Sequence, residues 1–370
     1  MEHKYVYGVV RAERFACPDM PGIDGSSVHA IVNGSLACVL SDYRGTGFST
    51  LSKEDLVRYL LAHQSVVEKV MQQHTVLPVK FGTVLSGEAE VRSFVSQGQP
   101  MLVDALNLLN DKIEMEVAAT WDTDRVLREI ADSEDVLRAR VALMSSSREV
   151  SFQDKVRLGQ LVKEAMDERR RGYSGRMLEV LGPLAVDLHA NALVSDQMVM
   201  NVAFLVQRER LGDFDGAVSK LNDLFDNQID FRIIGPLPPY SFATVEVTKL
   251  GLEKIDAARR LLRLEEPLSE TRVRRAYRRI AADNHPDVRV RDGAGPQDVL
   301  KLREASEILL SYCRQSGVKQ PLRNRINTVD AVSHALFVSI RSSIGERMSS
   351  GRLSGLAGPS TWQGSYAEAS

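Results

Sequence analysis

The sequence lacks most of the signals that mark secreted proteins and membrane proteins. Its three cysteines, Cys17, Cys38 and Cys313, are widely spaced and form no CxxC pair, so they indicate reduced thiols rather than a disulfide framework. The chain has no run of about 18 uncharged apolar residues, which argues against a membrane span. Its N-terminus lacks the basic flank and long apolar stretch of a signal peptide. We therefore expect a cytoplasmic protein.

Motifs of the common enzyme classes are also missing. No P-loop, GxGxxG, GxSxG or HExxH pattern occurs, and the His, Cys, Asp and Glu residues are not clustered at metal-ligand spacing. Glu114 and Glu116 lie on one face of a strand-like segment, and such alternating acids are usually solvated. The sequence thus predicts no catalytic residue, no cofactor and no metal site, and we expect a protein that is not an enzyme.

The composition is that of a globular protein with several domains. Of the 370 residues, 44% are apolar and 26% are charged, which argues against wholesale disorder. At about 150 residues per domain, this length predicts two or three domains. The net charge of −2 gives no overall attraction to nucleic acid or to acidic lipid.

Residues 1–121 read as a first α+β domain. A strand rich in Tyr and Val over 4–10 precedes two strands that flank Asn33-Gly34, a dipeptide suited to a tight hairpin. Helical segments are predicted around 88–109. The segment 112–121 has the alternation of a strand and is expected to close this domain.

A helix that begins at Ser52 is the strongest local prediction in this domain, because Ser52 is a good cap. Its predicted inward face carries four apolar residues, Leu56, Leu60, Val67 and Val70. His63 lies in phase with them and is expected to be a core histidine with one satisfied hydrogen bond. Gly82 is expected to take a conformation that other residues resist. Tyr240 and Phe242 are expected to anchor a proline-rich loop into the core.

Two more segments follow along the chain. Residues 122–190 are rich in helix formers and charge, and they predict a helical connector. Residues 191–250 read as a second α+β domain. It has strand-like segments at 198–206 and 229–234 and a helical segment at 214–225 between them.

These two blocks resemble the GvpL/GvpF family of gas vesicle proteins. The matching segments occur in the order that the family has them and cover about two-thirds of the chain. They are Tyr5–Val9, Pro21–Ile23, Thr75–Thr83, Lys112–Val117 with Trp121, Asn201–Val206 and Gly235–Phe242.

The resemblance implies a role in building gas vesicles, which are hollow shells made mainly of the small apolar subunit GvpA. It implies that the protein binds GvpA, and works with other gas vesicle proteins, in the cytoplasm and at the gas vesicle. A subunit with a large apolar face needs that face covered until it polymerises. The alternative that the resemblance leaves open is a minor structural protein of the vesicle shell.

Residues 251–316 predict a separate unit made only of helices. Ser269 is a good cap for its second helix, whose apolar stripe runs through Val273, Ala276, Tyr277 and Ile280. The opposite face carries Arg272, Arg274, Arg275, Arg278 and Arg279, and no acid lies between Thr271 and Ala282. This helix ends before Pro286, and a third helix over about 297–314 would pack against it as a hairpin.

This unit resembles a J domain. The match rests on the basic helix over 273–280, on the tripeptide His285-Pro286-Asp287 and on Glu304-Ala305 with Leu309. The resemblance implies that the tripeptide and the arginines bind a DnaK-type chaperone and stimulate its ATP hydrolysis. The arginines would steer an acidic partner surface, an effect that weakens with salt. If the J-like unit serves only for packing, no chaperone is recruited.

DNA binding by the arginine helix is the other reading, since five arginines could contact phosphates. The slightly acidic chain and the His-Pro-Asp turn argue against it, so we expect no nucleic-acid partner. Residues 317–370 are expected to form a short amphipathic helix at 331–340 and a disordered Gly/Ser-rich tail. The expected fold class is therefore α+β, with two ferredoxin-like domains, a helical segment joining them and a small all-α J-like hairpin.

Overall fold

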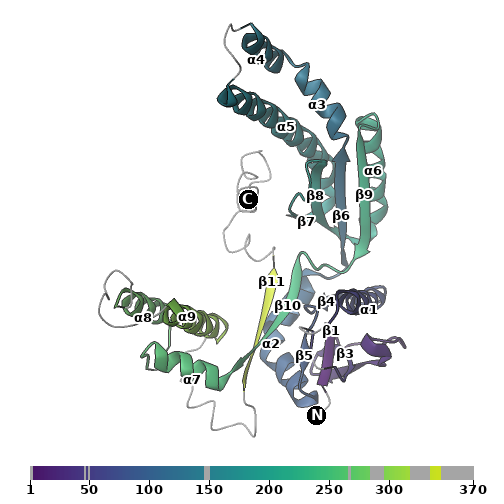
Figure 1. Cartoon of the computed structure of the whole chain (residues 1–370). Coiled ribbons are helices and arrows are strands. Elements are labelled where there is room, and N and C mark those ends of the chain that lie inside the picture. Colours follow the sequence, from purple (N-terminus) through teal and green to yellow (C-terminus); the bar gives the residue numbers. More distant parts are fainter. Residues whose placement is uncertain are drawn as a thin grey trace.

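The structure is a computed structural model of the whole chain, and it describes residues 3–45, 47–48, 51–145, 151–265, 268–283, 296–316 and 334–342. It is a mixed α+β protein whose sheets are antiparallel (Figure 1). The first sheet lies next to α1 and α2. The second sheet lies beyond it, under the long helix α5, and a group of three helices projects from the side of the first sheet.

The first sheet has the strand order β2-β3-β1-β4, and β5 also pairs with β1. Its strands are β1 (His3–Arg11), β2 (Val28–Asn33), β3 (Leu36–Tyr43), β4 (Val76–Pro78) and β5 (Val84–Leu85), with the short helix η1 (Ile23–Gly25) between β1 and β2. The predicted hairpin at Asn33-Gly34 is confirmed. Asn33 pairs with Leu36, and Gly34 has a φ of 66°, which favours glycine.

Helices α1 (Lys53–Met71) and α2 (Glu88–Leu108) cover opposite faces of this sheet. The predicted cap is confirmed, because the Asp55 backbone N–H donates to Ser52 Oγ over 3.1 Å. The predicted inward face of α1 is wrong in its first half. Leu56 and Leu60 are exposed, whereas Tyr59, His63, Val66, Val67 and Val70 are buried.

The second sheet has the order β7-β8-β6-β9. Its strands are β6 (Lys112–Trp121), β7 (Ala185–Ala190), β8 (Met198–Gln207) and β9 (Ile229–Leu237). The helices on one face are α5 (Phe152–Leu181) and α6 (Leu211–Leu224), with η2 (Gly182–Leu184) and η3 (Arg208–Arg210) at their ends. This is the β-α-β-β-α-β arrangement of ferredoxin-like folds.

The expectation that residues 112–121 close the first domain is therefore wrong. β6 pairs with β8 and β9, so it is a central strand of the second sheet. Its alternating residues Ile113, Met115 and Val117 are buried on the side that α5 and α6 cover. The alternation identifies a strand but carries no information about which sheet it joins.

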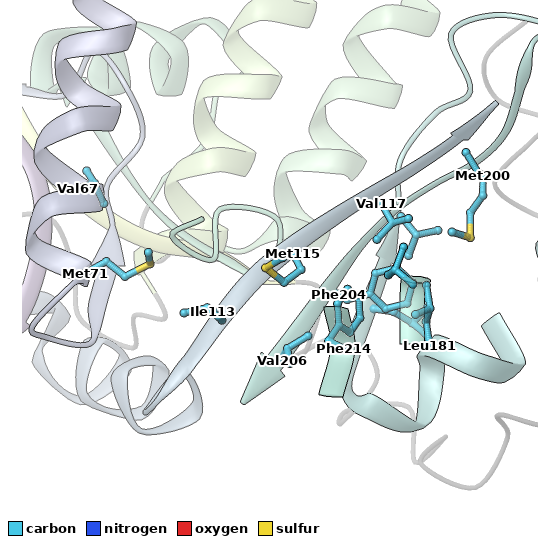
Figure 2. Close-up of a cluster of buried hydrophobic side chains, with 14 of the residues drawn as sticks. Val67, Met71, Ile113, Met115, Val117, Leu181, Met200, Phe204, Val206 and Phe214 are labelled. Atoms are coloured by element: carbon cyan, nitrogen blue, oxygen red, sulfur yellow. The ribbon is translucent and has the colours of Figure 1, made fainter. Parts of the chain in front are cut away.

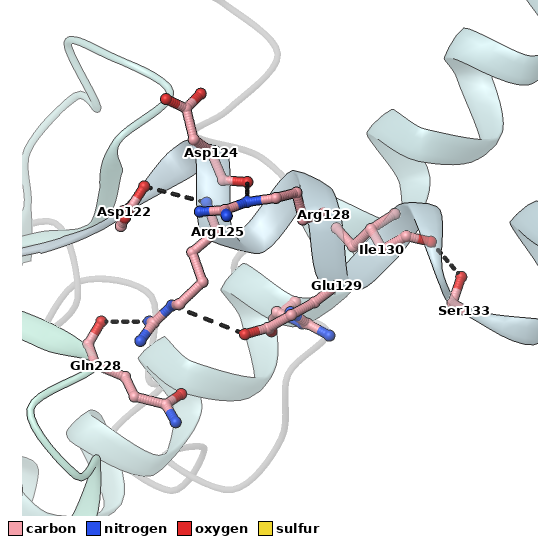
Figure 3. A network of polar contacts seen from close by, with 9 residues as sticks. Asp122, Asp124, Arg125, Arg128, Glu129, Ile130, Ser133 and Gln228 are labelled. Atoms are coloured by element: carbon pink, nitrogen blue, oxygen red, sulfur yellow. Dashed lines mark hydrogen bonds and ion pairs between the residues drawn. The ribbon is translucent and has the colours of Figure 1, made fainter.

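Most of the predicted helical connector over 122–190 forms α3 (Thr123–Ala131), α4 (Glu134–Met144) and α5, but the prediction is wrong for its last six residues, because they form strand β7. A polar network fixes α3 to the second sheet (Figure 3). Asp122 caps α3 by accepting from the Arg125 N–H over 3.1 Å, and Arg125 Nη2 donates to the Gln228 carbonyl oxygen over 2.9 Å. Glu129 forms ion pairs with Arg125 and with Arg169 of α5, which joins the two helices.

One apolar core runs through both sheets, so they do not pack as separate domains. Figure 2 shows Val67 and Met71 of α1 on one side of Ile113 and Met115, and Phe204 and Phe214 of the second sheet's core beyond them. Arg208 Nη2 also donates to the Met71 carbonyl oxygen over 2.9 Å. The two α+β parts are thus joined through buried side chains as well as through the chain.

After β9 the chain returns to the first sheet. β10 (Ala243–Gly251) runs beside the end of β4, where the Lys80 N–H donates to the Val245 carbonyl oxygen over 2.8 Å. β11 (His334–Ser342) pairs with β10 along nine residues, from Ala243↔Ser342 to Gly251↔His334. The ribbon β10-β11 packs against α2 (Figure 1), and Leu336 joins the core there.

The predicted short helix at 331–340 is therefore wrong. Leu336, Val338 and Ile340 alternate along β11 and pack on one core, as a strand requires. A ten-residue segment that is mostly apolar fits the period of a strand as well as that of a helix, so periodicity alone does not distinguish them. The rest of the predicted tail lies outside the described residues.

Between β10 and β11 the structure describes three helices, α7 (Leu252–Leu261), α8 (Glu270–Asp283) and α9 (Pro296–Ser316). They have a core of their own, separate from the two sheets. The helical unit is thus inserted between two paired strands and is held to the body at both ends. Among the helices that the structure describes, none is long and apolar enough to cross a membrane.

Candidate partner-binding surfaces

The arginine helix α8 has one buried side and one charged side. Val273 and Ala276 are buried, and they pack in the core of the helical unit with Ile255, Leu302 and Leu309. Ser269 lies at the start of the helix, and its Oγ accepts from the Arg272 N–H over 3.4 Å. The five predicted arginines, Arg272, Arg274, Arg275, Arg278 and Arg279, are all exposed.

Three of these five charges have no acidic partner among the described residues. Arg274 lies 3.6 Å from Glu270 at the start of the same helix. No ion pair joins Arg275, Arg278 or Arg279 to an acidic residue in the part of the chain that the structure describes. The exposed side of α8 is therefore a compact positive surface on a protein whose net charge is −2.

The predicted hairpin brings α9 against both α7 and α8. Ala305 and Leu309, which carried part of the J-domain resemblance, are buried between these helices, whereas Glu304 is exposed. The tripeptide His285-Pro286-Asp287 lies outside the described residues. Its position relative to the arginines therefore stays a prediction.

A second surface lies on α1 and was missed by the sequence interpretation. Four neighbouring side chains on its N-terminal half are between 40% and 60% exposed: Leu56, Val57, Leu60 and Leu61. We call this set the α1 stripe. At i, i+1, i+4 and i+5 these residues form one continuous band on a helix. The sequence contained a sign of this surface. Val57 and Leu61 make the apolar arc of α1 wider than one sheet face can cover.

A third surface lies at the far end of the helical connector. Met144 at the end of α4 and Phe152 at the start of α5 are 77% and 81% exposed, and Val141 and Val156 are exposed nearby along the same helices. We call these four residues the apolar tip, and the two helices that carry them lie side by side (Figure 1). The apolar tip lies far from α1, which carries the α1 stripe (Figure 1).

A buried polar cluster lies where the two sheets meet. His63 Nδ1 is 2.9 Å from the Tyr5 hydroxyl, which also accepts from the Gly82 N–H over 3.1 Å. His63 Nε2 has no hydrogen-bond partner in the described structure. Burial lowers the pKa of His63 to about 4. The core role predicted for His63 is confirmed, as is the special backbone of Gly82, whose φ is 84°.

Glu114 belongs to the same region, and the expectation that it is solvated is wrong. Its side chain is only 1% exposed, and its two carboxylate oxygens accept from the Ser241 N–H over 2.8 Å and from the Ser241 hydroxyl over 2.7 Å. Burial raises its pKa to about 7, against the lowering effect of these two hydrogen bonds. Phe242, next to Ser241, is fully buried and Tyr240 is half-buried, so Glu114 fixes the loop that leads into β10.

The contacts of this buried polar cluster connect segments of the protein to one another, which is a structural role. Its groups contact one another and apolar side chains within the protein. Within the described residues, no group of three or more His, Cys, Asp and Glu side chains is placed to hold a metal ion. The exposed surfaces described above that could bind a partner are the α8 arginines, the α1 stripe and the apolar tip.

Comparisons with known proteins fit the first two-thirds of the chain. Residues 3–244 match the family described as Gas vesicle synthesis protein GvpL/GvpF. A gas vesicle protein F from Streptomyces sp. (strain CB03234) is 29% identical over 244 residues, which are 64% of this chain and 98% of that protein. A gas vesicle protein F from Nostoc sp. (strain PCC 7120) is 23% identical over 65% of this chain and 98% of its own length.

Solved structures show the same fold over the same part. The crystal structure of gas vesicle protein GvpF from Anabaena sp. PCC7120 covers 65% of this chain with a TM-score of 0.59 and 22% identity, and 98% of that chain is covered. The GvpF structure from Microcystis aeruginosa gives a TM-score of 0.55 with the same identity and coverage. The helical unit and β11 lie beyond the matched residues. From the match over residues 3–244, the chain belongs to the GvpL/GvpF family of gas vesicle synthesis proteins.

Proposed function

We propose that this protein is a gas vesicle assembly factor that binds the small apolar shell subunit GvpA and keeps it from aggregating. The observation that carries this proposal is the α1 stripe. It places four neighbouring apolar side chains in solvent, on a helix whose other side is fixed in the core by Tyr59, His63 and Val66. Contiguous exposed apolar surface on a folded protein marks an interaction site.

The α1 stripe suits a partner that is itself apolar. A shell subunit waiting to polymerise exposes apolar surface, and covering it on a rigid helix removes both surfaces from water. The contact needs no chemical step, which agrees with a site built from aliphatic side chains. The protein would act in the cytoplasm and at the growing vesicle, together with other gas vesicle proteins.

Co-expression with GvpA tests this proposal. The wild-type chain should raise the soluble fraction of GvpA and co-purify with it. The double variant Val57→Lys/Leu61→Lys should lose both effects, because two charges would have to be buried in the contact. Val186→Lys on β7 is the matched control, since Val186 and Val57 are both 55% exposed.

The outcomes test the assembly role and the choice of binding surface separately. If wild-type protein leaves GvpA insoluble and does not co-purify, the assembly role is wrong. If the double variant acts like wild type, the α1 stripe is the wrong surface, and the same experiment with Val141→Lys/Met144→Lys tests the apolar tip. Retention of the protein in washed, intact vesicles would instead favour a minor structural protein of the shell.

We further propose that the helical unit recruits a DnaK-type chaperone. Three exposed arginines without an acidic partner in the described part of the chain, Arg275, Arg278 and Arg279, support an electrostatic contact with an acidic surface. His285, Pro286 and Asp287 would trigger ATP hydrolysis, as the J-domain resemblance implies.

ATP turnover by a DnaK-type chaperone, measured with and without this protein, tests the second proposal. Turnover should rise with the wild-type chain and not with His285→Gln. The substitution Arg278→Ala should weaken the effect and its dependence on salt, whereas Arg303→Ala on α9, where Arg303 pairs with Glu307, should not. Equal turnover with and without the protein would leave the helical unit a purely structural element.

A further inference from the structure

The outer strand of the second sheet, β9, has one edge that is not paired. β9 lies at the end of the order β7-β8-β6-β9, and its register with β6 runs from Trp121↔Ile229 to Glu116↔Ile234 and, after an irregularity, to Glu114↔Leu237. No other strand in the described part of the chain pairs with β9 (Figure 1). The backbone N–H and C=O groups on the outer side are therefore available to another strand.

The side chains of β9 have a pattern that is complementary to itself. Asp230 and Arg232 are two residues apart, so they point to the same face, and both are exposed. Neither forms an ion pair with another residue in the described structure. On the other face Ile229 is buried, Phe231 is half-buried and Ile233 is 41% exposed, so apolar surface continues to the edge of the sheet.

We propose that β9 is the docking surface for a second copy of this chain, in an antiparallel pair centred on Phe231. In that register Asp230 lies opposite Arg232 of the second copy, and Arg232 lies opposite the second copy's Asp230. Ile229 lies opposite Ile233 of the second copy on the other face. Both opposite-charge pairs and both apolar pairs form at once, because a two-fold axis repeats each contact.

The alternative purpose of these charges is protection of the edge. Charged side chains, especially lysine, often protect an edge, and charges of a single sign would repel an identical strand. On β9 the two charges are opposite in sign and symmetric about Phe231, so an identical strand in this register is attracted. A register shifted by one residue would place charged residues against apolar ones, which disfavours it.

The chain around β9 limits the length of the pairing. Asp226 and Asn227 before the strand have positive φ angles, and Pro236 near its end has no N–H to donate. The ladder is thus restricted to about the five residues from Ile229 to Ile233. A contact of this size predicts a dimer that dissociates on dilution rather than a permanent one.

Sedimentation of the full chain over a range of concentrations tests the proposal. Wild type should be a dimer at high concentration and a monomer on dilution. Asp230→Arg and Arg232→Asp should each weaken the dimer at least about tenfold, because each places like charges opposite one another twice. Asp135→Arg and Arg140→Asp on α4 are matched controls, since they make the same charge changes at exposed sites.

Two combinations make the test specific for this register. The double variant Asp230→Arg/Arg232→Asp restores opposite charges across the axis, so it should dimerise like wild type. An equimolar mixture of the two single variants should form a heterodimer, because one strand then carries two arginines and the other two aspartates. A wild-type chain that stays monomeric, or single variants that dimerise like wild type, would overturn the proposal, including the case in which β9 binds only a strand of another protein.

Discussion

Replacing Glu114 by Gln should change how the stability of the fold depends on pH. The Glu114 carboxylate is buried where the two sheets meet, and both of its oxygens accept hydrogen bonds from Ser241. Burial raises its pKa from an ordinary value of 4.5 to about 7. The folded state therefore holds the proton more tightly than the unfolded chain does.

The sign and size of the effect follow from that difference. A raised pKa contributes stability that is fully present below pH 4.5 and is lost as the pH rises through about 7. At about 1.4 kcal/mol per pH unit, the contribution is at most about 3.5 kcal/mol, and about 2.5 kcal/mol of it disappears between pH 5 and pH 8. Glu114→Gln stays uncharged and lacks this contribution.

The effect is measured by urea unfolding of wild type and Glu114→Gln at pH 5 and pH 8. The quantity compared is the difference between their free energies of unfolding at each pH. His63 has the opposite sign, because its lowered pKa removes stability as the pH falls from 6.5 towards about 4. It is present in both proteins and cancels in the difference. The stability of wild type relative to the variant should fall by about 2.5 kcal/mol from pH 5 to pH 8, a shift of roughly 1 M urea in the midpoint.

Glu116→Gln is the matched control, since it removes the same charge from a less buried position on β6. It should alter the pH dependence much less than Glu114→Gln does. An unchanged difference between wild type and Glu114→Gln at the two pH values would refute the argument. It would mean that the Ser241 hydrogen bonds outweigh the cost of burying the charge.

Two further changes test the fold. Leu336→Ala on β11 should lower the free energy of unfolding by about 2–4 kcal/mol, because Leu336 is buried in the core beneath α2. Arg341→Ala on the exposed side of the same strand should change it by less than about 0.5 kcal/mol, and an equal effect of both changes in urea unfolding would mean that β11 does not pack in the core beneath α2. His63→Met should make the protein more resistant to acid, since the His63 pKa of about 4 makes its protonation below pH 6.5 unfavourable in the fold. Melting temperatures at pH 7 and pH 4.5 check this, and an identical acid-induced decrease in wild type and variant would contradict it.

Features set by local chemistry could be predicted from the sequence. The Ser52 cap, the Asn33-Gly34 hairpin and the positive φ of Gly82 each depend on a few neighbouring residues, and each is confirmed. The core role of His63 followed from its phase among apolar residues. The ordered family segments gave the family itself.

Features set by distant contacts could not be predicted in this way. The partners of β6 lie about 80 to 120 residues away along the chain, and those of β11 about 90, so no local pattern specifies them. The burial of Glu114 depends on Ser241, which the fold brings to it from beyond β9. The prediction put Leu56 and Leu60 on the buried face of α1. The sheet covers only the neighbouring arc of this helix, so both residues are exposed and belong to the α1 stripe.

Vesicle formation in cells tests the central claim most directly, which is that the α1 stripe holds the shell subunit soluble before assembly. Cells that lack this chain should contain few or no gas vesicles by electron microscopy. Wild type and Val186→Lys should restore vesicles, whereas Val57→Lys/Leu61→Lys, present at the same level, should not. Abundant normal vesicles in cells without the chain would contradict the account.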